Sequence, residues 1–302
     1  MSLTAGIDVG STYTKAVLLD GEERIVGCGV LKTGFKLAEA ALRAYATALA
    51  DAGAGERDVA YTVATGYGRL QVAFSNVQVT DLTAAARGAT LLFPATRTIL
   101  DVGGQTMKAT RIDERAKVRS FRLNDKCAAG TGAFLEKTAH YMGYSTDDIG
   151  PLAMMSRSPA AISGVCAVFA ESEVINHLSQ GTSPSDIMQG AILSLVDRSI
   201  QLMRRVQLAP EYTLVGGILR FESMGRLLRE RLGTAANVPA PDLVQMIGAL
   251  GAARLGRQRL RQIAGGPVAP ITALPNPRET TVTETTLPQE TALPLDKHFF
   301  RR

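Results

Sequence analysis

The chain has 302 residues, of which 46% are hydrophobic and 20% charged, which allows a sizeable core and two domains. Its apolar runs are too short to cross a membrane, no signal peptide is expected, and an odd count of three cysteines argues against a disulfide framework, so we expect a cytoplasmic protein with no membrane partner. The net charge of +5 comes without a nucleic-acid motif or interleaved aromatic residues, so no nucleic-acid partner is expected.

The first 95 residues predict a domain that opens with a β-hairpin. Apolar residues alternate over residues 5–9 and 13–20, and Gly10, Ser11 and Thr12 form the turn between them. The following segments predict a third strand, an alanine-rich helix, a strand that ends in a loop, and a second helix, over residues 24–34, 37–53, 58–69 and 81–93.

The opening pattern recurs in residues 96–113, TRTILDVGGQTMKATRID, and this internal duplication places a domain boundary near residue 95. The second domain, residues 96–265, is expected to hold helices that begin near residues 131, 167 and 186, a strand–glycine turn–helix unit over 211–233, and a closing helix within 241–263 that could pack back on the first domain. Residues 266–302 hold six of the 13 prolines among threonines and glutamates, a composition typical of a flexible tail.

Two Asp-x-Gly turns, each between strands, have the residues that a phosphate clamp between two domains needs. Glycine lets backbone N–H groups approach phosphate oxygens, hydroxyls add donors, and aspartates can hold Mg²⁺ or position an attacking water. The first turn offers Asp8, Gly10, Ser11, Thr12 and Lys15, the second offers Asp101, Gly103, Gly104 and Gln105, and a later glycine turn offers Gly216 and Gly217. No P-loop occurs, so the pattern predicts nucleotide binding by a different kind of site.

Cys127 and Cys166 each stand at the start of a predicted helix, where unpaired N–H groups and the helix dipole favour a thiolate. A thiolate binds soft metals, and an iron–sulfur cluster commonly needs four of them. Two per chain give four in a dimer, so one cluster shared between subunits is predicted. Cys28 lies in an apolar strand and is expected in the core. Small buried side chains remain the alternative for the other two, and nucleophilic catalysis lacks a base paired with either.

The segments IDVGST, LDVGGQT and LVGGI resemble the two phosphate loops and the adenosine loop of the actin, Hsp70 and sugar kinase superfamily. This resemblance implies an α/β protein with two ribonuclease-H-like domains and ATP in the cleft between them.

A closer resemblance covers residues 5–256. NDKCAAGTGAFLE and CAVFAESEVINHLSQG, together with ATGYGR and GALGAA, are similar to the ATP-dependent activators of 2-hydroxyacyl-CoA dehydratases and the ATP-binding subunits of benzoyl-CoA reductases. It implies an oxygen-sensitive dimer of homologous ATPase subunits that share one [4Fe-4S] cluster held by Cys127 and Cys166. Ferredoxin or flavodoxin reduces that cluster, and ATP hydrolysis drives low-potential electrons to iron–sulfur partner subunits that hold the CoA ester. The resemblance also implies the roles of the cleft residues. The residues around the phosphates and Mg²⁺ would be Asp8, Gly10, Ser11, Thr12, Asp101, Gly103, Gly104 and Gln105, and of these Asp8, Asp101 and Gln105 would be catalytic. Gly216 and Gly217 would lie against the adenosine.

One position departs from the family pattern. The activators usually carry an aspartate after the glutamine of the second phosphate loop, and here the residue is Thr106. With the long tail, this difference favours the electron-activating subunit of a benzoyl-CoA reductase, in anaerobic aromatic degradation. The alternatives are an activator of a 2-hydroxyacyl-CoA dehydratase and, from another class, a small-molecule kinase whose cysteines are structural.

Overall fold

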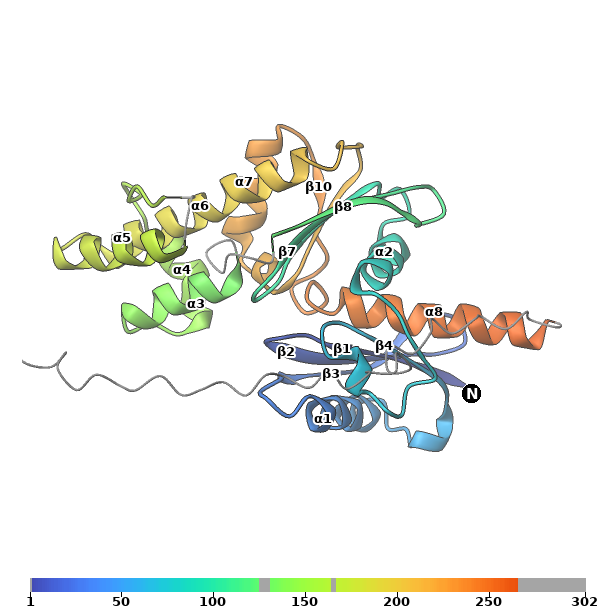
Figure 1. Ribbon diagram of the computed structural model, residues 1–302. Coiled ribbons are helices and arrows are strands. Elements are labelled where there is room, and N and C mark those ends of the chain that lie inside the picture. Colours follow the sequence, from blue (N-terminus) through green and yellow to red (C-terminus); the bar gives the residue numbers. More distant parts are fainter. Residues whose placement is uncertain (1, 125–130, 164–166, 266–302) are drawn as a thin grey trace, which may run out of the picture. The chain divides into compact units, whose positions relative to one another are not determined.

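The computed structural model describes residues 2–124, 131–163 and 167–265, and these residues contain two five-stranded sheets (Figure 1). The strand orders are β3-β2-β1-β4-β5 and β10-β9-β6-β7-β8. In each sheet the first three strands in sequence form an antiparallel meander, and the fourth and fifth pair in parallel beyond the first. The strand–turn–strand duplication predicted from the sequence therefore extends to two whole sheets of one topology.

The first lobe is built on the first sheet. Its strands are β1 (Leu3–Val9), β2 (Tyr13–Leu19), β3 (Ile25–Lys32), β4 (Val59–Thr65) and β5 (Val77–Gln78). Helix α1 (Leu37–Asp51) covers one face, where its alanines pack against apolar residues of β1 and β2. β1 is the central strand and is almost entirely buried because packed layers cover both of its faces.

Helices α2 (Asp81–Leu92) and α8 (Ile247–Ala264) pack against each other between the two sheets (Figure 1). One buried cluster joins them to β2 of the first sheet and to β6, β7 and β9 of the second. The packing is very close: a Cβ on Gly251 of α8 would lie 1.8 Å from the carbonyl oxygen of Ala84 in α2, and a Cβ on Gly6 of β1 would lie 1.9 Å from that of Ala249 in α8. The chain thus returns to the first lobe after completing the second.

The second lobe is built on the second sheet, with a core centred on the long helix α6. Its strands are β6 (Thr98–Val102), β7 (Met107–Ile112), β8 (Val118–Asn124), β9 (Tyr212–Val215) and β10 (Ala236–Asn237). Its helices are α3 (Gly132–Tyr141), α4 (Ile149–Met154), α5 (Ala167–Ser179), α6 (Pro184–Arg204) and α7 (Glu222–Leu232). Short 3₁₀ helices complete the described elements of both lobes: η1 (Glu56–Asp58), η2 (Arg69–Gln71), η4 (Thr146–Asp148) and η5 (Gly217–Arg220). Ile187, Ile192 and Leu195 of α6 are fully buried in this core.

The predicted α/β class is confirmed, and the helices expected near residues 131, 167 and 186 begin at Gly132, Ala167 and Pro184. The sequence reading missed β8 because it is an edge strand whose residues are largely exposed or half-buried, so no apolar alternation marks it. The predicted tail, residues 266–302, lies outside the described residues. None of the helices in the described part of the chain is long and apolar enough to cross a membrane.

Candidate nucleotide-binding site

A cleft of about 870 Å³ opens between the two lobes, at the ends of the strands that carry the two Asp-x-Gly turns. This volume is within the usual range of small-molecule sites. All the residues predicted to bind nucleotide line it: Asp8, Gly10, Ser11, Thr12, Lys15, Asp101, Gly103, Gly104, Gln105, Gly216 and Gly217. The fold therefore brings together residues that are more than 200 positions apart in the sequence. The two predicted cluster ligands, Cys127 and Cys166, lie outside the described residues.

The first turn is held closed by its own backbone. The Gly10 N–H donates to the carbonyl of Tyr13 at 3.1 Å, and the Thr33 hydroxyl donates to the carbonyl of Gly10 at 2.8 Å. Asp8 and Lys15 face each other across the β1–β2 pair, and Lys15 Nζ lies 3.1 Å from Asp8 Oδ2. The lysine and the aspartate therefore form one half-buried pair at the cleft wall.

The second turn repeats this arrangement and also contacts a helix. The Gly103 N–H donates to the carbonyl of Thr106 at 2.9 Å. The carbonyls of Gly103 and Gly104 accept hydrogen bonds from the N–H groups of Gly132 and Ala133, at 3.0 and 2.7 Å. These donors belong to the first turn of α3, whose N–H groups have no partner within the helix. The second Asp-x-Gly turn and the start of α3 are thus joined directly.

A charged group surrounds Asp101 on the second lobe. Lys108, which faces Asp101 across the β6–β7 pair, places Nζ 2.7 Å from Asp81 Oδ2 and 3.8 Å from Asp101 Oδ2. Burial alone would lower the pKa of Lys108, but the carboxylates of Asp101 and Asp81 outweigh it and the pKa lies above its ordinary value. Burial raises the pKa of Asp101, and Lys108, which lies closer to Asp81 than to Asp101, only partly offsets this effect. Burial also opposes ionisation of Asp81, yet the adjacent Lys108 keeps the pKa of that carboxyl below its ordinary value.

Glycines let backbone approach both carboxylates and bring the two turns into contact. A Cβ on Gly66 would lie 2.4 Å from Asp8 Oδ1, and a Cβ on Gly216 would lie 2.8 Å from Asp101 Oδ1. Both glycines have positive φ, at 86° and 102°, which other residues rarely adopt. A Cβ on Gly104 would lie 2.3 Å from Thr12 Oγ1 on the opposite lobe. At these three positions the structure leaves no room for a side chain.

The sequence reading missed several charged and polar residues of the same cleft: Arg69, Asp81, Lys108, Glu136, Arg220 and Gln245. One of these residues, Lys108, could have been predicted from the sequence. Lys108 follows Asp101 by seven residues, as Lys15 follows Asp8, so the duplication itself predicts an equivalent pair. The others come from loops and helices far apart in the sequence, and only the fold brings them together.

Mg²⁺ fits this donor set. The described residues include no group of three or more His, Cys, Asp or Glu side chains placed to hold a metal by themselves. Mg²⁺ is commonly held by one or two carboxylates with waters and substrate phosphates, and Asp8 and Asp101 supply two carboxylates beside the phosphate turns. Cys28 does not suit a metal, because burial raises the pKa of its thiol and disfavours the thiolate.

Two lobes of one topology around a glycine-lined cleft define an ATP-binding protein of the actin and Hsp70 type. The chain belongs to the BadF/BadG/BcrA/BcrD ATPase family, whose model matches residues 5–256. It is 40% identical over 250 residues to the activator of lactoyl-CoA dehydratase of Anaerotignum propionicum, and the match covers 83% of this chain and 95% of the relative. It is 35% identical over 290 residues to a benzoyl-CoA reductase subunit from Thauera aromatica, and that match covers 87% of this chain and 100% of the relative. Among solved structures, the ADPNP-bound activator of 2-hydroxyisocaproyl-CoA dehydratase from Clostridium difficile matches with a TM-score of 0.82 and 34% identity, over 89% of this chain and 100% of that one.

Proposed function

We propose that this protein is an ATP-hydrolysing activator that delivers low-potential electrons to a 2-hydroxyacyl-CoA dehydratase. The observation that carries the proposal is the cleft itself, where the two duplicated turns supply facing aspartates, lysines and backbone amides. The relatives support the choice of client. This chain is 40% identical to the lactoyl-CoA dehydratase activator and 35% identical to the benzoyl-CoA reductase subunit. We therefore place the activator function ahead of the reductase function that the sequence analysis favoured.

In this proposal ATP lies across the two turns. Amides of the glycine turns and the hydroxyls of Ser11 and Thr12 donate to its phosphates, with Gly216 and Gly217 against the adenosine. Asp8 and Asp101 would hold Mg²⁺, which would neutralise charge on the phosphates, and Gln105 would orient the attacking water. The carboxylate of Asp101 must be ionised for this role, and burial, which raises its pKa, opposes that ionisation.

The contacts of α3 support coupling between the nucleotide and the two predicted cluster ligands. Its first turn is hydrogen-bonded to Gly103 and Gly104, as described above, and its Lys137 Nζ lies 2.6 Å from Glu171 Oε2 of α5. In the sequence, α3 follows Cys127 and α5 follows Cys166. A change in the second phosphate turn would therefore be felt by both helices. Two packed helices with two arrangements are one known way to transmit a nucleotide change.

The remaining parts of the proposal come from the resemblance and from the relatives. Cys127 and Cys166 of one protomer, with the same pair of a second protomer, bind one [4Fe-4S] cluster, which supplies one-electron transfer when present. Ferredoxin or flavodoxin is the electron donor, and the cytoplasm is the expected compartment. The electron-activating role in a benzoyl-CoA reductase is the second candidate. The match to the Thauera aromatica subunit covers 100% of that subunit, and this chain carries Thr106 where the activators usually carry aspartate.

Anaerobic purification followed by iron and sulfide analysis tests the redox part. We expect about four irons per dimer, loss of iron in Cys127→Ala and in Cys166→Ala with nucleotide binding kept, and full iron in the matched control Cys28→Ala. Asp101→Asn should keep the iron and lose ATP-driven electron transfer. A fully active, iron-free preparation would contradict the redox part. Adding the purified protein to a 2-hydroxyacyl-CoA dehydratase and, separately, to a benzoyl-CoA reductase core decides the client, since activation of the second alone would refute our choice.

A further inference from the structure

We infer that Arg69 is a phosphate-binding residue that contacts, from the first lobe, the terminal phosphate of ATP and stabilises the charge that develops on it during hydrolysis. This inference rests on the proposed function and extends it to a residue of the ATGYGR segment that the site described above did not use. Arg69 begins η2, directly after the loop that follows β4, and it lines the cleft.

The charges of the cleft single out this arginine. The cations that line it in the described part of the chain are Lys15, Arg69, Lys108 and Arg220. The others form ion pairs with carboxylates: Lys15 with Asp8 at 3.1 Å, Lys108 with Asp81 at 2.7 Å, and Arg220 with Asp147 at 3.0 Å. No carboxylate of the described residues forms an ion pair with Arg69, whose Nη1 donates to the carbonyl of Gly66 at 3.1 Å. A guanidinium has five N–H donors, so most of them are available to a ligand.

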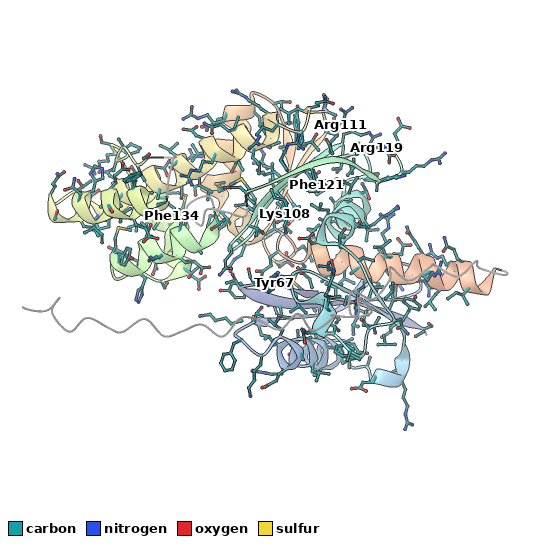
Figure 2. The ribbon with its side chains drawn as sticks, in the orientation of Figure 1. Tyr67, Lys108, Arg111, Arg119, Phe121 and Phe134 are labelled. Atoms are coloured by element: carbon teal, nitrogen blue, oxygen red, sulfur yellow. The ribbon has the colours of Figure 1, made fainter. Side chains whose placement is uncertain are left out.

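The surroundings place Arg69 near the carboxylates of the site. Its charge acts on Asp81, which pairs with Lys108, and Lys108 lies 3.8 Å from Asp101. Figure 2 shows Lys108 on the second lobe and Tyr67 on the first. Tyr67 lies two residues before Arg69 in the sequence. Both residues line the cleft, but Tyr67 is 76% exposed whereas Arg69 is half-buried, which favours the arginine as the residue that meets a ligand inside the cleft.

The loop that carries Arg69 is fixed to the first phosphate turn. The Gly68 N–H donates to the carbonyl of Val9 at 2.9 Å, and Val9 directly precedes Gly10. A Cβ on Gly68 would lie 2.5 Å from Val9 Cγ1, and one on Gly66 would meet Asp8, so neither glycine can be replaced without moving the loop. Arg69 is therefore held in register with Asp8 and the first turn. A fixed cation costs little reorganisation when charge develops in the reaction.

The chemistry suits an arginine. In hydrolysis the water oxygen forms a bond to the γ-phosphorus, the bond to the bridging oxygen breaks, and ADP leaves with that electron pair. One water proton stays on the released phosphate and the other passes to solvent. Negative charge develops on the γ-phosphate oxygens and the bridging oxygen, and a planar guanidinium can bind two phosphate oxygens at once. An arginine in this position is worth about 10³- to 10⁵-fold in known phosphoryl-transfer enzymes.

The test compares Arg69→Ala and Arg69→Lys with Arg57→Ala, which removes an exposed arginine that does not line the cleft. Calorimetry measures binding of ADPNP, ADP and AMP, and phosphate release measures hydrolysis. We expect Arg69→Ala to lose at least about 100-fold in the rate of hydrolysis and to weaken ADPNP binding more than ADP binding, with AMP binding unchanged. Arg69→Lys should recover part of both losses, and Arg57→Ala should match the wild type.

The outcomes separate the hypotheses. If Arg69→Ala weakens binding of the three nucleotides equally, or lowers only the melting temperature, the arginine acts through its bond to Gly66 and the inference is wrong. Wild-type rates in Arg69→Ala also overturn it while leaving the proposed function intact. A wild-type protein that binds none of the nucleotides would overturn the proposed function, and this inference with it.

Discussion

The contact between the two phosphate turns leads to a sharp prediction for Gly104→Ala. The added Cβ would lie 2.3 Å from Thr12 Oγ1 and 2.9 Å from Thr12 Cβ, against about 3.4 Å for an ordinary contact. Rotation of the Thr12 side chain can move Oγ1 but not Cβ. The backbones must therefore separate by about 0.5 Å at least, and overpacking of this kind typically costs about 1–3 kcal/mol.

This cost falls on the closed arrangement of the two turns, which is the arrangement that both lobes need to contact one nucleotide. We therefore expect the dissociation constant for ADPNP to rise about 5- to 150-fold, since each 1.4 kcal/mol is tenfold. Calorimetric titration measures this, and circular dichroism checks that the variant is folded. Gly55→Ala is the matched control, because the nearest atom to its Cβ, Asp58 Oδ2, lies at 3.7 Å.

A second change at the contact tests the steric cause. Thr12→Gly removes the clashing Cβ, so the double variant Thr12→Gly/Gly104→Ala should bind ADPNP more tightly than Gly104→Ala alone, although Thr12→Gly itself loses a hydroxyl donor. A folded Gly104→Ala protein with wild-type affinity would refute the reasoning, because the two turns would then not need to touch when nucleotide binds.

Three further predictions concern stability and pH. Thr80→Ala removes the hydroxyl that caps α2 by accepting from the Thr83 N–H and should cost about 1 kcal/mol of unfolding free energy in urea; an unchanged midpoint would contradict the cap. Lys108→Met removes a cation beside Asp101, so the pKa of that carboxyl should rise further and the acid limb of the pH–rate profile should move to higher pH; a limb that stays in place would refute it. Asp186 accepts hydrogen bonds from the backbone N–H of Ser158, from the Ser156 hydroxyl and from other nearby donors, which lower its pKa. The stability that the ionised Asp186 adds is therefore present above about pH 4 and lost at lower pH. Asp186→Asn should be less stable than the wild type at pH 7 and equally stable in acid. A difference in stability that persists in acid would contradict this prediction.

The sequence predicts many of the residues that line the cleft, because they stand in local patterns. A buried strand, an Asp-x-Gly turn and a second strand mark Asp8 and Asp101 wherever they occur, and β-pairing then fixes the lysine seven residues later. Arg69 and Asp81 have no such local pattern. They reach the cleft because β4 runs parallel to β1 and because α2 begins beside the second sheet, and both facts are set by long-range pairing and packing.

The sequence predicts β1 but not β8, and the difference also has a physical cause. β1 is recognisable because its apolar residues alternate over positions 5–9, whereas β8 is an edge strand with three of its seven residues half-buried and the rest exposed. The proposed client has a weaker basis. Thr106 is the described residue that the sequence analysis used, in favour of a benzoyl-CoA reductase, whereas the higher identity of the lactoyl-CoA dehydratase activator favours a dehydratase.

The path of the chain limits how the lobes can move. The polypeptide crosses from the first lobe to the second between α2 and β6, and crosses back between β10 and α8. Two crossings beside a shared layer of tightly packed helices leave rotation about one axis as the easiest relative motion of the lobes, because twisting about other axes would break the α2–α8 packing. A change in the opening of the cleft would therefore be accommodated at these two crossings, far from the outer edges of both sheets.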